Sequence, residues 1–245
     1  MTELRVIPVT GLPEVTAGAD LANLATDCCK VEDGDVLVVA QKIVSKAEGR
    51  VVALADFEPS AQARELAGDE EDPRHIEAIL RESVRIVRAR GPLVIAETRH
   101  GFVCASAGVD ASNAPGEGML VLLPLDPDAS ARGIRDRIRE LTGRTVAVIV
   151  SDSFGRPFRN GTTDVAIGVA GLEPLLDLRG KRDRSGYTLR STLIAVADEL
   201  AGAAELVMGK ADGVPAALVR GFAYPVSEDS GANLLVLPRE RDLFR

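Results

Sequence analysis

The stretch TVAVIV at 145–150, followed at once by SDSFGR at 151–156, has the largest influence on the fold expected for this chain. A short continuous apolar run bounded by polar residues is typical of a buried strand. A second run, FVCA at 102–105, leads into GVDASN at 108–113. The sequence therefore predicts two buried strands, each ending in a loop that carries a carboxylate beside a hydroxyl or amide group.

The carboxylates of Asp110 and Asp152 in these loops have two interpretations. Oxygen ligands of this kind suit Mg²⁺ or Mn²⁺, which bind through one or two carboxylates plus substrate phosphates. Such an ion would hold phosphate oxygens for phosphoryl transfer. Asp, Ser and Asn after a strand also simply hydrogen-bond a turn, and for one loop alone this is the commoner case.

The composition describes an ordinary globular protein of 245 residues, with one large domain or two lobes. A net charge of -8 and an aromatic content of 3% argue against nucleic acid as a partner. No apolar run approaches the ~20 residues that span a bilayer, so no membrane association is expected. The three cysteines, with Cys28 and Cys29 adjacent, form no disulfide framework and fit a reducing cytoplasm.

Strand-like and helix-like patterns alternate along the chain, which predicts an α/β fold, with α+β as the alternative. Strands are expected at 36–40, 93–96, 119–123 and 216–219. A helix is expected to begin at Asp72-Pro73 and to end at Gly91-Pro92, with an apolar stripe formed by Ile76, Ile79, Leu80, Val84 and Val87. Another is expected from Asp126-Pro127 to Gly143, with Ile134, Ile138 and Leu141 facing inward. A third is expected at about 193–208, before Gly209.

Common nucleotide and hydrolase motifs are missing: there is no G-x-x-x-x-G-K-[ST], no G-x-G-x-x-G and no G-x-S-x-G. His75 and His100 are interpreted as a surface residue and a turn residue. Six basic residues are close in sequence and form either an anion-binding region or a solvated loop: Arg156, Arg159, Arg179, Lys181, Arg182 and Arg184. The residues alone thus indicate a metal-assisted enzyme that acts on phosphate-bearing substrates.

Several blocks, in order along nearly the whole chain, resemble the coenzyme F420-0:gamma-glutamyl ligase family. They are IPVTGLP at 7–13, residues 33–50, AGVDASN at 107–113, LPLDPD at 123–128, SDSFGR at 151–156 and VADEL at 196–200. RNGTTD at 159–164 and the ending at 242–244 are most similar to the ligase portion of the bacterial two-domain enzyme. In that enzyme a nitroreductase-like domain follows. Residues 1–245 are therefore expected to form a ligase domain without that second domain, either as a separate enzyme or as an excised part.

The resemblance implies the fold of that family, an intertwined homodimer and a GTP-dependent ligase. This ligase would add L-glutamate to the carboxylate of coenzyme F420-0 through an acyl phosphate, giving GDP and phosphate, with further gamma-linked glutamates open. Mg²⁺ or Mn²⁺ would be required, with K⁺ as an additional candidate, and no enzyme nucleophile. Two alternatives stay open: a related GTP-dependent amide ligase acting on another carboxylate, and a non-catalytic protein that binds GTP or a deazaflavin.

Carried over position by position, the resemblance implies that Asp110, Asp152 and Ser153 bind metal, with Ser153 standing where the family more often has Thr. The implied nucleotide-binding residues are Thr10, Gly11, Leu12, Pro13, Gln41, Lys42, Lys46, Asn113, Met208, Gly209, Lys210, Ala211, Asp212, Gly213 and Val214.

Lys210 departs from the archaeal pattern, in which this position is acidic and is associated with a second metal. An ammonium group has three donors and no acceptor, so it cannot ligate a metal. Either Asp212 substitutes or the charge of Lys210 replaces that of the second metal, which leaves open whether one or two metals bind.

Overall fold

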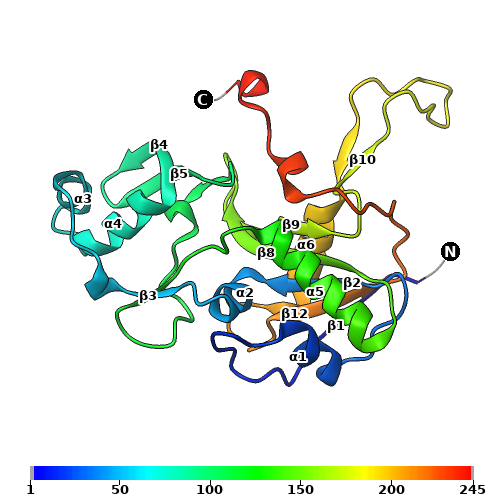
Figure 1. Ribbon diagram of the computed structural model, residues 1–245. Helices are drawn as coiled ribbons and strands as arrows, with labels where there is room; N and C mark the ends of the chain where they lie inside the picture. The colour runs from blue at the N-terminus through cyan, green and yellow to red at the C-terminus, as the bar shows by residue number, and fades with distance from the viewer. Residues whose placement is uncertain (1–2, 244–245) are drawn as a thin grey trace.

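The computed structural model describes residues 3–243, which form a central sheet with helices on both faces and a smaller group of strands and helices beside it (Figure 1). The strands are β1 (Arg5–Pro8), β2 (Val36–Ala40), β3 (Val51–Ala53), β4 (Ser83–Arg90), β5 (Leu93–Thr98), β6 (Val103–Ala105), β7 (Met119–Val121), β8 (Ala147–Gly155), β9 (Thr162–Ala170), β10 (Leu175–Asp177), β11 (Leu193–Ala195) and β12 (Ala216–Arg220). The helices are α1 (Leu21–Cys28), α2 (Gln41–Ala47), α3 (Ala61–Ala67), α4 (Pro73–Glu82), α5 (Pro127–Thr142) and α6 (Val196–Met208), with short 3₁₀ turns at Leu54–Asp56, Ser106–Gly108, Ala232–Leu235 and Arg239–Arg241.

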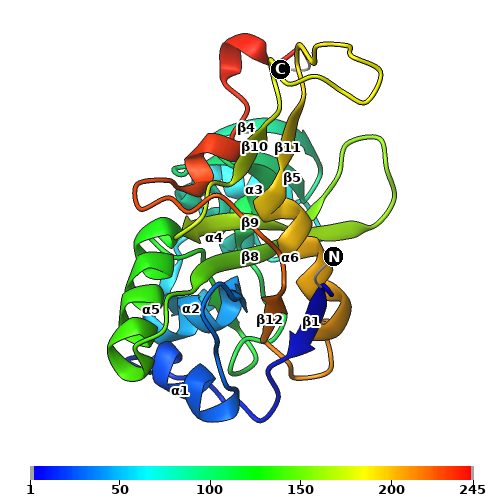
Figure 2. The same ribbon diagram turned by 90° about the vertical axis from the view of Figure 1, so that its right-hand side faces the viewer.

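The central sheet is mixed and has five strands in the order β1-β12-β2-β8-β9. Only β2 and β8 are parallel, and the other neighbours are antiparallel. Successive side chains of a strand point to opposite faces. Val148 and Val150 accordingly pack with α1, α2 and α5, whereas Ala147 and Ile149 pack with α6 on the other face (Figure 2). A mixed α/β fold is thus confirmed, in a three-layer arrangement.

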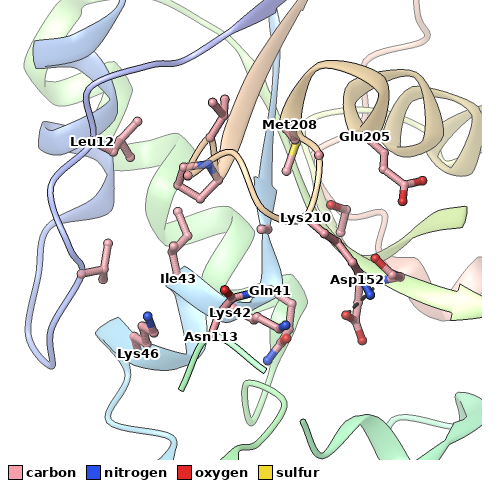
Figure 3. Close-up of a pocket in the computed structure, with 18 of the residues that line it drawn as sticks. Leu12, Gln41, Lys42, Ile43, Lys46, Asn113, Asp152, Glu205, Met208 and Lys210 are labelled. Atoms are coloured by element: carbon pink, nitrogen blue, oxygen red, sulfur yellow. Dashed lines mark hydrogen bonds between the residues drawn. The ribbon is translucent and has the colours of Figure 1, made fainter. Parts of the chain in front are cut away.

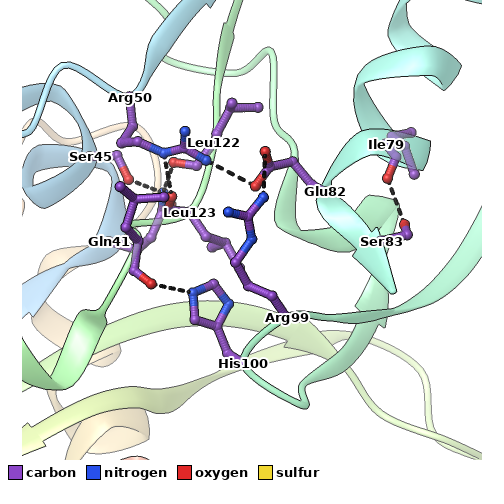
Figure 4. A network of polar contacts seen from close by, with 11 residues as sticks. Gln41, Ser45, Arg50, Ile79, Glu82, Ser83, Arg99, His100, Leu122 and Leu123 are labelled. Atoms are coloured by element: carbon purple, nitrogen blue, oxygen red, sulfur yellow. Dashed lines mark hydrogen bonds and ion pairs between the residues drawn. The ribbon is translucent and has the colours of Figure 1, made fainter. Parts of the chain in front are cut away.

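A second apolar cluster lies in the part of the chain between α2 and α5, where α3 and α4 pack with the β4-β5-β6 sheet and the β3-β7 pair. A polar network connects it to the central layers (Figure 4). Arg50 donates from Nε to the carbonyl oxygen of Leu123 at 2.9 Å and from Nη2 to Glu82 Oε2 at 2.9 Å. Arg99 donates to the other oxygen of Glu82 at 3.2 Å. This network fixes where the loop carrying Asp110 meets the central sheet.

Most predicted elements are confirmed, including the strands at β2, β5 and β12 and the N-terminal caps of α4 and α5. Asp72 and Asp126 accept hydrogen bonds from Arg74 N–H and Ala129 N–H, both at 2.8 Å. Gly143 ends α5 with a φ of 71°. His100 lies in a turn as expected, and its Nε2 is 3.1 Å from the carbonyl oxygen of Leu125.

The helix predicted to run to Gly91-Pro92 is wrong beyond Glu82. Residues 83–90 form β4, in which Val84 is 66% exposed, so Val84 and Val87 do not continue the helical stripe. The positive φ of Gly91 turns the chain back and lets β4 pair antiparallel with β5. β-Branched residues fit a pleated sheet, and this pairing outweighs the local helical pattern.

Five smaller predictions are also corrected. The helix at 193–208 begins at Val196, because Leu193–Ala195 pairs with β10. The strand expected at 119–123 stops at Val121. Leu141 is exposed rather than inward-facing, and His75 is partly buried. Most important for the site, SDSFGR is no loop, because β8 continues to Gly155 alongside β9.

A bulge interrupts the β8-β9 pairing next to the polar residues of β8. Val150 lies opposite Gly168, but Ser151 lies opposite Ala166, so β9 contains one extra residue at this point. Beyond the bulge Asp152 is opposite Val165 and Ser153 is opposite Asp164. Residues directly opposite in a ladder share a face. Ser151, Ser153 and Asp164 therefore lie on the α6 face, and Asp152 lies on the α2 face.

We expect Gly168→Ala to destabilise the protein by about 2 kcal/mol or more, because a Cβ there would lie 2.2 Å from the carbonyl oxygen of Pro127 at the start of α5. Gly133→Ala is the matched control. Gly133 is exposed within α5 and a Cβ there would meet nothing within 4 Å, so this change should stabilise by about 0.5–1 kcal/mol. Urea unfolding of both variants measures the difference, and equal midpoints would contradict this close packing.

Candidate functional site

The main cavity, of about 370 Å³, lies where β2 leads into α2 and beside the polar half of β8. Ligands of open α/β sheets commonly bind at the carboxyl ends of strands, and β2 and β8 are the parallel pair. In Figure 3 Leu12 and Lys46 lie on one side of the cavity, Ile43 and Lys42 lie in the middle, and Met208, Lys210 and Asp152 lie on the other side. The cavity thus offers both apolar and charged side chains to a ligand.

The two lysines of α2 are held by carboxylates. Lys42 Nζ lies 2.7 Å from Asp110 Oδ2 and 2.5 Å from Ser112 Oγ. Lys46 is buried, and its Nζ lies 2.5 Å from Glu14 Oε1, whose side chain is 72% exposed. Because Lys42 and Lys46 are four residues apart on a helix, they share a face. They present two adjacent positive charges to the main cavity.

Gln41 also lines the main cavity, but its amide nitrogen is committed to the protein. It donates to Ser45 Oγ at 2.6 Å and to the carbonyl oxygen of Leu122 at 3.2 Å (Figure 4). These bonds join α2 to the chain just after β7. The donors of Gln41 thus position α2 rather than point at a ligand.

A second cavity, of about 250 Å³, adjoins the main one. The two share four residues, namely Lys42, Asp152, Ser153 and Lys210. Asp110 lines only the second cavity, beside Ser106 and Gly108 of the 3₁₀ turn. The two acidic segments singled out in the sequence thus both line the second cavity, with Asp152 in a strand rather than a loop.

The two aspartates differ electrostatically. Burial raises the pKa of Asp152 to about 7, and the negative charges of Asp164 and Asp110 act in the same direction. Burial also opposes ionisation of Asp110, but hydrogen bonds from Lys42 and from the backbone of Ser112 outweigh it and lower its pKa. Asp152 makes no ion pair within residues 3–243. A cation bound beside Asp152 would offset the energetic cost of burying its negative charge.

Divalent metal fits this donor set. Mg²⁺ needs only one or two carboxylates when substrate phosphates and water complete its coordination. Asp110 and Asp152 provide two carboxylates on the wall of one cavity, with Ser153 beside them. Within residues 3–243 no group of three His, Cys, Asp or Glu side chains could hold a metal alone. The residues thus suit a metal bound together with a phosphate-bearing ligand.

The remaining predicted residues divide into those that line the main cavity and those that do not. Gly11 has a positive φ of 85°, but neither Thr10 nor Gly11 lines the main cavity. Asp212 is turned back toward Gly209, where a Cβ would lie 2.4 Å from its Oδ2. The lining residues from the prediction are Leu12, Pro13, Gln41, Lys42, Lys46, Asn113, Asp152, Ser153, Met208, Gly209, Lys210, Ala211, Gly213 and Val214.

The sequence analysis did not identify four polar residues that line the main cavity. It also offered a cluster of basic residues as an anion-binding region, and these residues do not line the cavity. Glu14, Ser151, Asp164 and Glu205 all line it. Asp164 lies within the RNGTTD block, so the block itself was a signal, whereas nothing local marks Glu205 on α6. The six clustered basic residues line neither cavity, and Arg179 forms an ion pair with Asp177 at 2.5 Å.

Taken together, a charged cavity bounded by lysines and aspartates is typical of an enzyme that acts on anionic substrates. The chain matches the F420-0:Gamma-glutamyl ligase family over residues 11–221. It is 48% identical to the coenzyme F420:L-glutamate ligase of Methanothermobacter thermautotrophicus over 99% of both chains. It is 48% identical to that of Methanopyrus kandleri over 99% of this chain and 98% of the relative, and 43% identical to that of Methanocaldococcus jannaschii with the same coverage. The protein belongs to the F420-0:gamma-glutamyl ligase family and is a ligase.

Within residues 3–243, no helix combines the length and the apolar character that crossing a bilayer requires.

We expect Asp152→Asn to stabilise the metal-free protein at pH 8. The folded state keeps a proton on Asp152 up to about pH 7, whereas the unfolded state loses it near pH 3.8. The protonated Asp152 side chain thus contributes its full stabilisation of the folded state below about pH 4, and this contribution is lost as pH rises toward 7. Removing the charge recovers at most about 4 kcal/mol. Thermal unfolding with a chelator present measures the gain. Equal melting temperatures of the variant and the wild-type protein at pH 8 would show that the buried charge of Asp152 does not destabilise the folded state.

Proposed function

We propose that this protein ligates L-glutamate to the carboxylate of coenzyme F420-0 and that GTP drives the reaction, giving GDP and phosphate. The observation that carries the proposal is the shared wall between two cavities, formed by Lys42, Asp152, Ser153 and Lys210. Phosphoryl transfer requires donor and acceptor oxygens on opposite sides of the transferred group. The names of the related ligases supply the acceptor and the amino acid.

In this proposal GTP occupies the main cavity. Its base packs against apolar side chains of the cavity wall, such as Leu12 and Ile43, and its phosphates lie near Lys42 and Lys46. Phosphate oxygens would replace Glu14 at Lys46, because that carboxylate is exposed and free to move aside. Lysine is a common phosphate-binding residue that acts as a point charge. The acceptor carboxylate then enters through the second cavity.

The chemistry needs no enzyme nucleophile. A carboxylate oxygen of F420-0 attacks the γ-phosphorus, and the bond from that phosphorus to GDP breaks. The neutral amine of glutamate attacks the resulting acyl phosphate, the C–N bond forms, phosphate leaves and the amine proton passes to solvent. The protein's contribution is to align the reactants and to offset their negative charges.

Asp110 and Asp152, with Ser153, would hold Mg²⁺ or Mn²⁺, and K⁺ is an additional candidate. When bound, the divalent ion would neutralise phosphate oxygens and orient them. A homodimer is also proposed, from the family resemblance alone.

We expect oxygen from the F420-0 carboxylate to appear in the released phosphate. If the acyl phosphate forms, carboxylate labelled with ¹⁸O must transfer one labelled oxygen per turnover. Mass spectrometry of phosphate and of the glutamylated product measures both. Unlabelled phosphate beside normal product would refute this path, and formation of GMP would indicate a guanylate intermediate. Turnover with another carboxylate only, or GTP binding without turnover, would support the two alternative functions.

We expect Lys210→Ala to weaken GTP binding even when Mn²⁺ is plentiful, and Lys210→Glu to raise the Mn²⁺ concentration needed for activity. Lys210 lies in the shared wall, where its charge offsets phosphate charge. Titration of Mn²⁺ against activity, with GTP affinity measured separately, tests both variants. Three superimposable curves with unchanged GTP affinity would make Lys210 a surface residue only.

A further inference from the structure

Asp164 is a buried carboxylate whose two oxygens are both used by serine hydroxyl groups. Ser151 donates to Oδ2 at 2.8 Å, and Ser153 donates to Oδ1 at 2.7 Å. Asp164 is 6% exposed, and it makes no ion pair within residues 3–243. A carboxylate in the wall of the main cavity thus has two hydroxyl partners and no lysine partner.

This arrangement determines what Ser153 can bind. A hydroxyl group has one hydrogen and two lone pairs, and an ionised carboxylate can only accept. Once Ser153 has given its hydrogen to Asp164, its oxygen can offer only lone pairs to the cavities that it lines. Lone pairs bind a cation or an N–H group, whereas a phosphate oxygen needs a donor. Ser153 is therefore suited to a cation beside Asp152.

The position of Asp164 is set before any ligand arrives. Its backbone N–H donates to Glu205 Oε2 of α6 at 2.9 Å. On the other side, its place opposite Ser153 in the β8-β9 ladder puts both side chains on one face. A carboxylate held by its backbone, its strand register and two hydroxyl groups has little freedom to turn into the cavity.

We infer that Asp164 is a positioning residue, which orients the Ser153 hydroxyl so that its oxygen would face a divalent cation in the second cavity, which Asp110, Asp152 and Ser153 all line. The inference rests on the metal requirement of the proposed function. Groups that orient metal ligands in this way typically change metal affinity by 10–100-fold when they are removed.

A purely structural role for Asp164 is the main alternative, and α6 provides a matched control. Asp198 lies seven positions before Glu205 and accepts the backbone N–H of Ala166 at 2.9 Å. It joins the same helix to the same strand, but it lines neither cavity. Asp198→Asn therefore reproduces a carboxylate-to-amide change at the α6-β9 contact without touching Ser153.

The test measures Mn²⁺ binding by electron paramagnetic resonance, using the full chain with GDP and without F420-0 or glutamate. Asp164→Asn should weaken Mn²⁺ binding about tenfold or more, because an amide offers one acceptor oxygen instead of two. Asp198→Asn should leave it unchanged. Ser153→Ala should weaken it, and adding Asp164→Asn to Ser153→Ala should weaken it no further. GDP affinity without metal, measured for each variant, separates a loss of metal binding from a loss of nucleotide binding.

Wild-type Mn²⁺ affinity in a folded Asp164→Asn variant would overturn the inference, as would full additivity with Ser153→Ala. Should Asp164→Asn fail to fold, Glu205→Ala removes the acceptor of the Asp164 N–H, and Glu205→Gln restores one. Mn²⁺ binding should fall in the first and recover in the second, and equal affinities would overturn the inference. If Mn²⁺ binds as expected but F420-0 is not glutamylated, only the proposed function fails.

Discussion

The register of β8 against β9 determines which polar groups meet at the shared wall of the two cavities. Because β9 contains one extra residue opposite the Val150–Ser151 step, Ser153 comes to lie opposite Asp164. Without that bulge, Ser153 would face Val165 and the hydroxyl-carboxylate contact would be lost, since a shift of one residue moves side chains to the other face. Asp152, one position away, points to the α2 face and meets Lys42 and Asp110 there. The bulge thus pairs Ser153 with Asp164, and the ordinary alternation of side chains along β8 puts Asp152 on the other face.

The sequence was sufficient for elements whose signals are local. Caps at Asp72 and Asp126 and the apolar run of β8 depend on neighbouring residues, and all three were predicted. The failures came where pairing with another strand decides the structure. Val84 and Val87 fit a helical stripe, but pairing with β5 makes them a strand. Likewise the alternating polar residues after Val150 look like a loop until β9 supplies their hydrogen-bonding partners.

The site divides in the same way. Family resemblance indicated Lys42, Lys46, Asp110 and Asp152, and the fold brings them to adjoining cavities. It did not indicate Asp164 or Glu205, whose roles depend on contacts between residues 11 and 41 positions apart. Nor does the family resemblance show that the amide nitrogen of Gln41 donates to Ser45 Oγ and to the carbonyl oxygen of Leu122. A motif identifies residue types near a ligand. Which hydrogen-bonding groups of these residues stay available to the ligand depends on the contacts in the folded chain.

β9 is an outer strand of the central sheet, and such strands usually offer their backbone to any other strand that approaches. Here three of its N–H groups are already taken by carboxylates: Asp164 N–H by Glu205, Ala166 N–H by Asp198 and Val169 N–H by Asp128. An incoming chain would have to displace negatively charged acceptors that are fixed on α5 and α6. These three acids therefore oppose self-association of the molecule through this edge of the sheet.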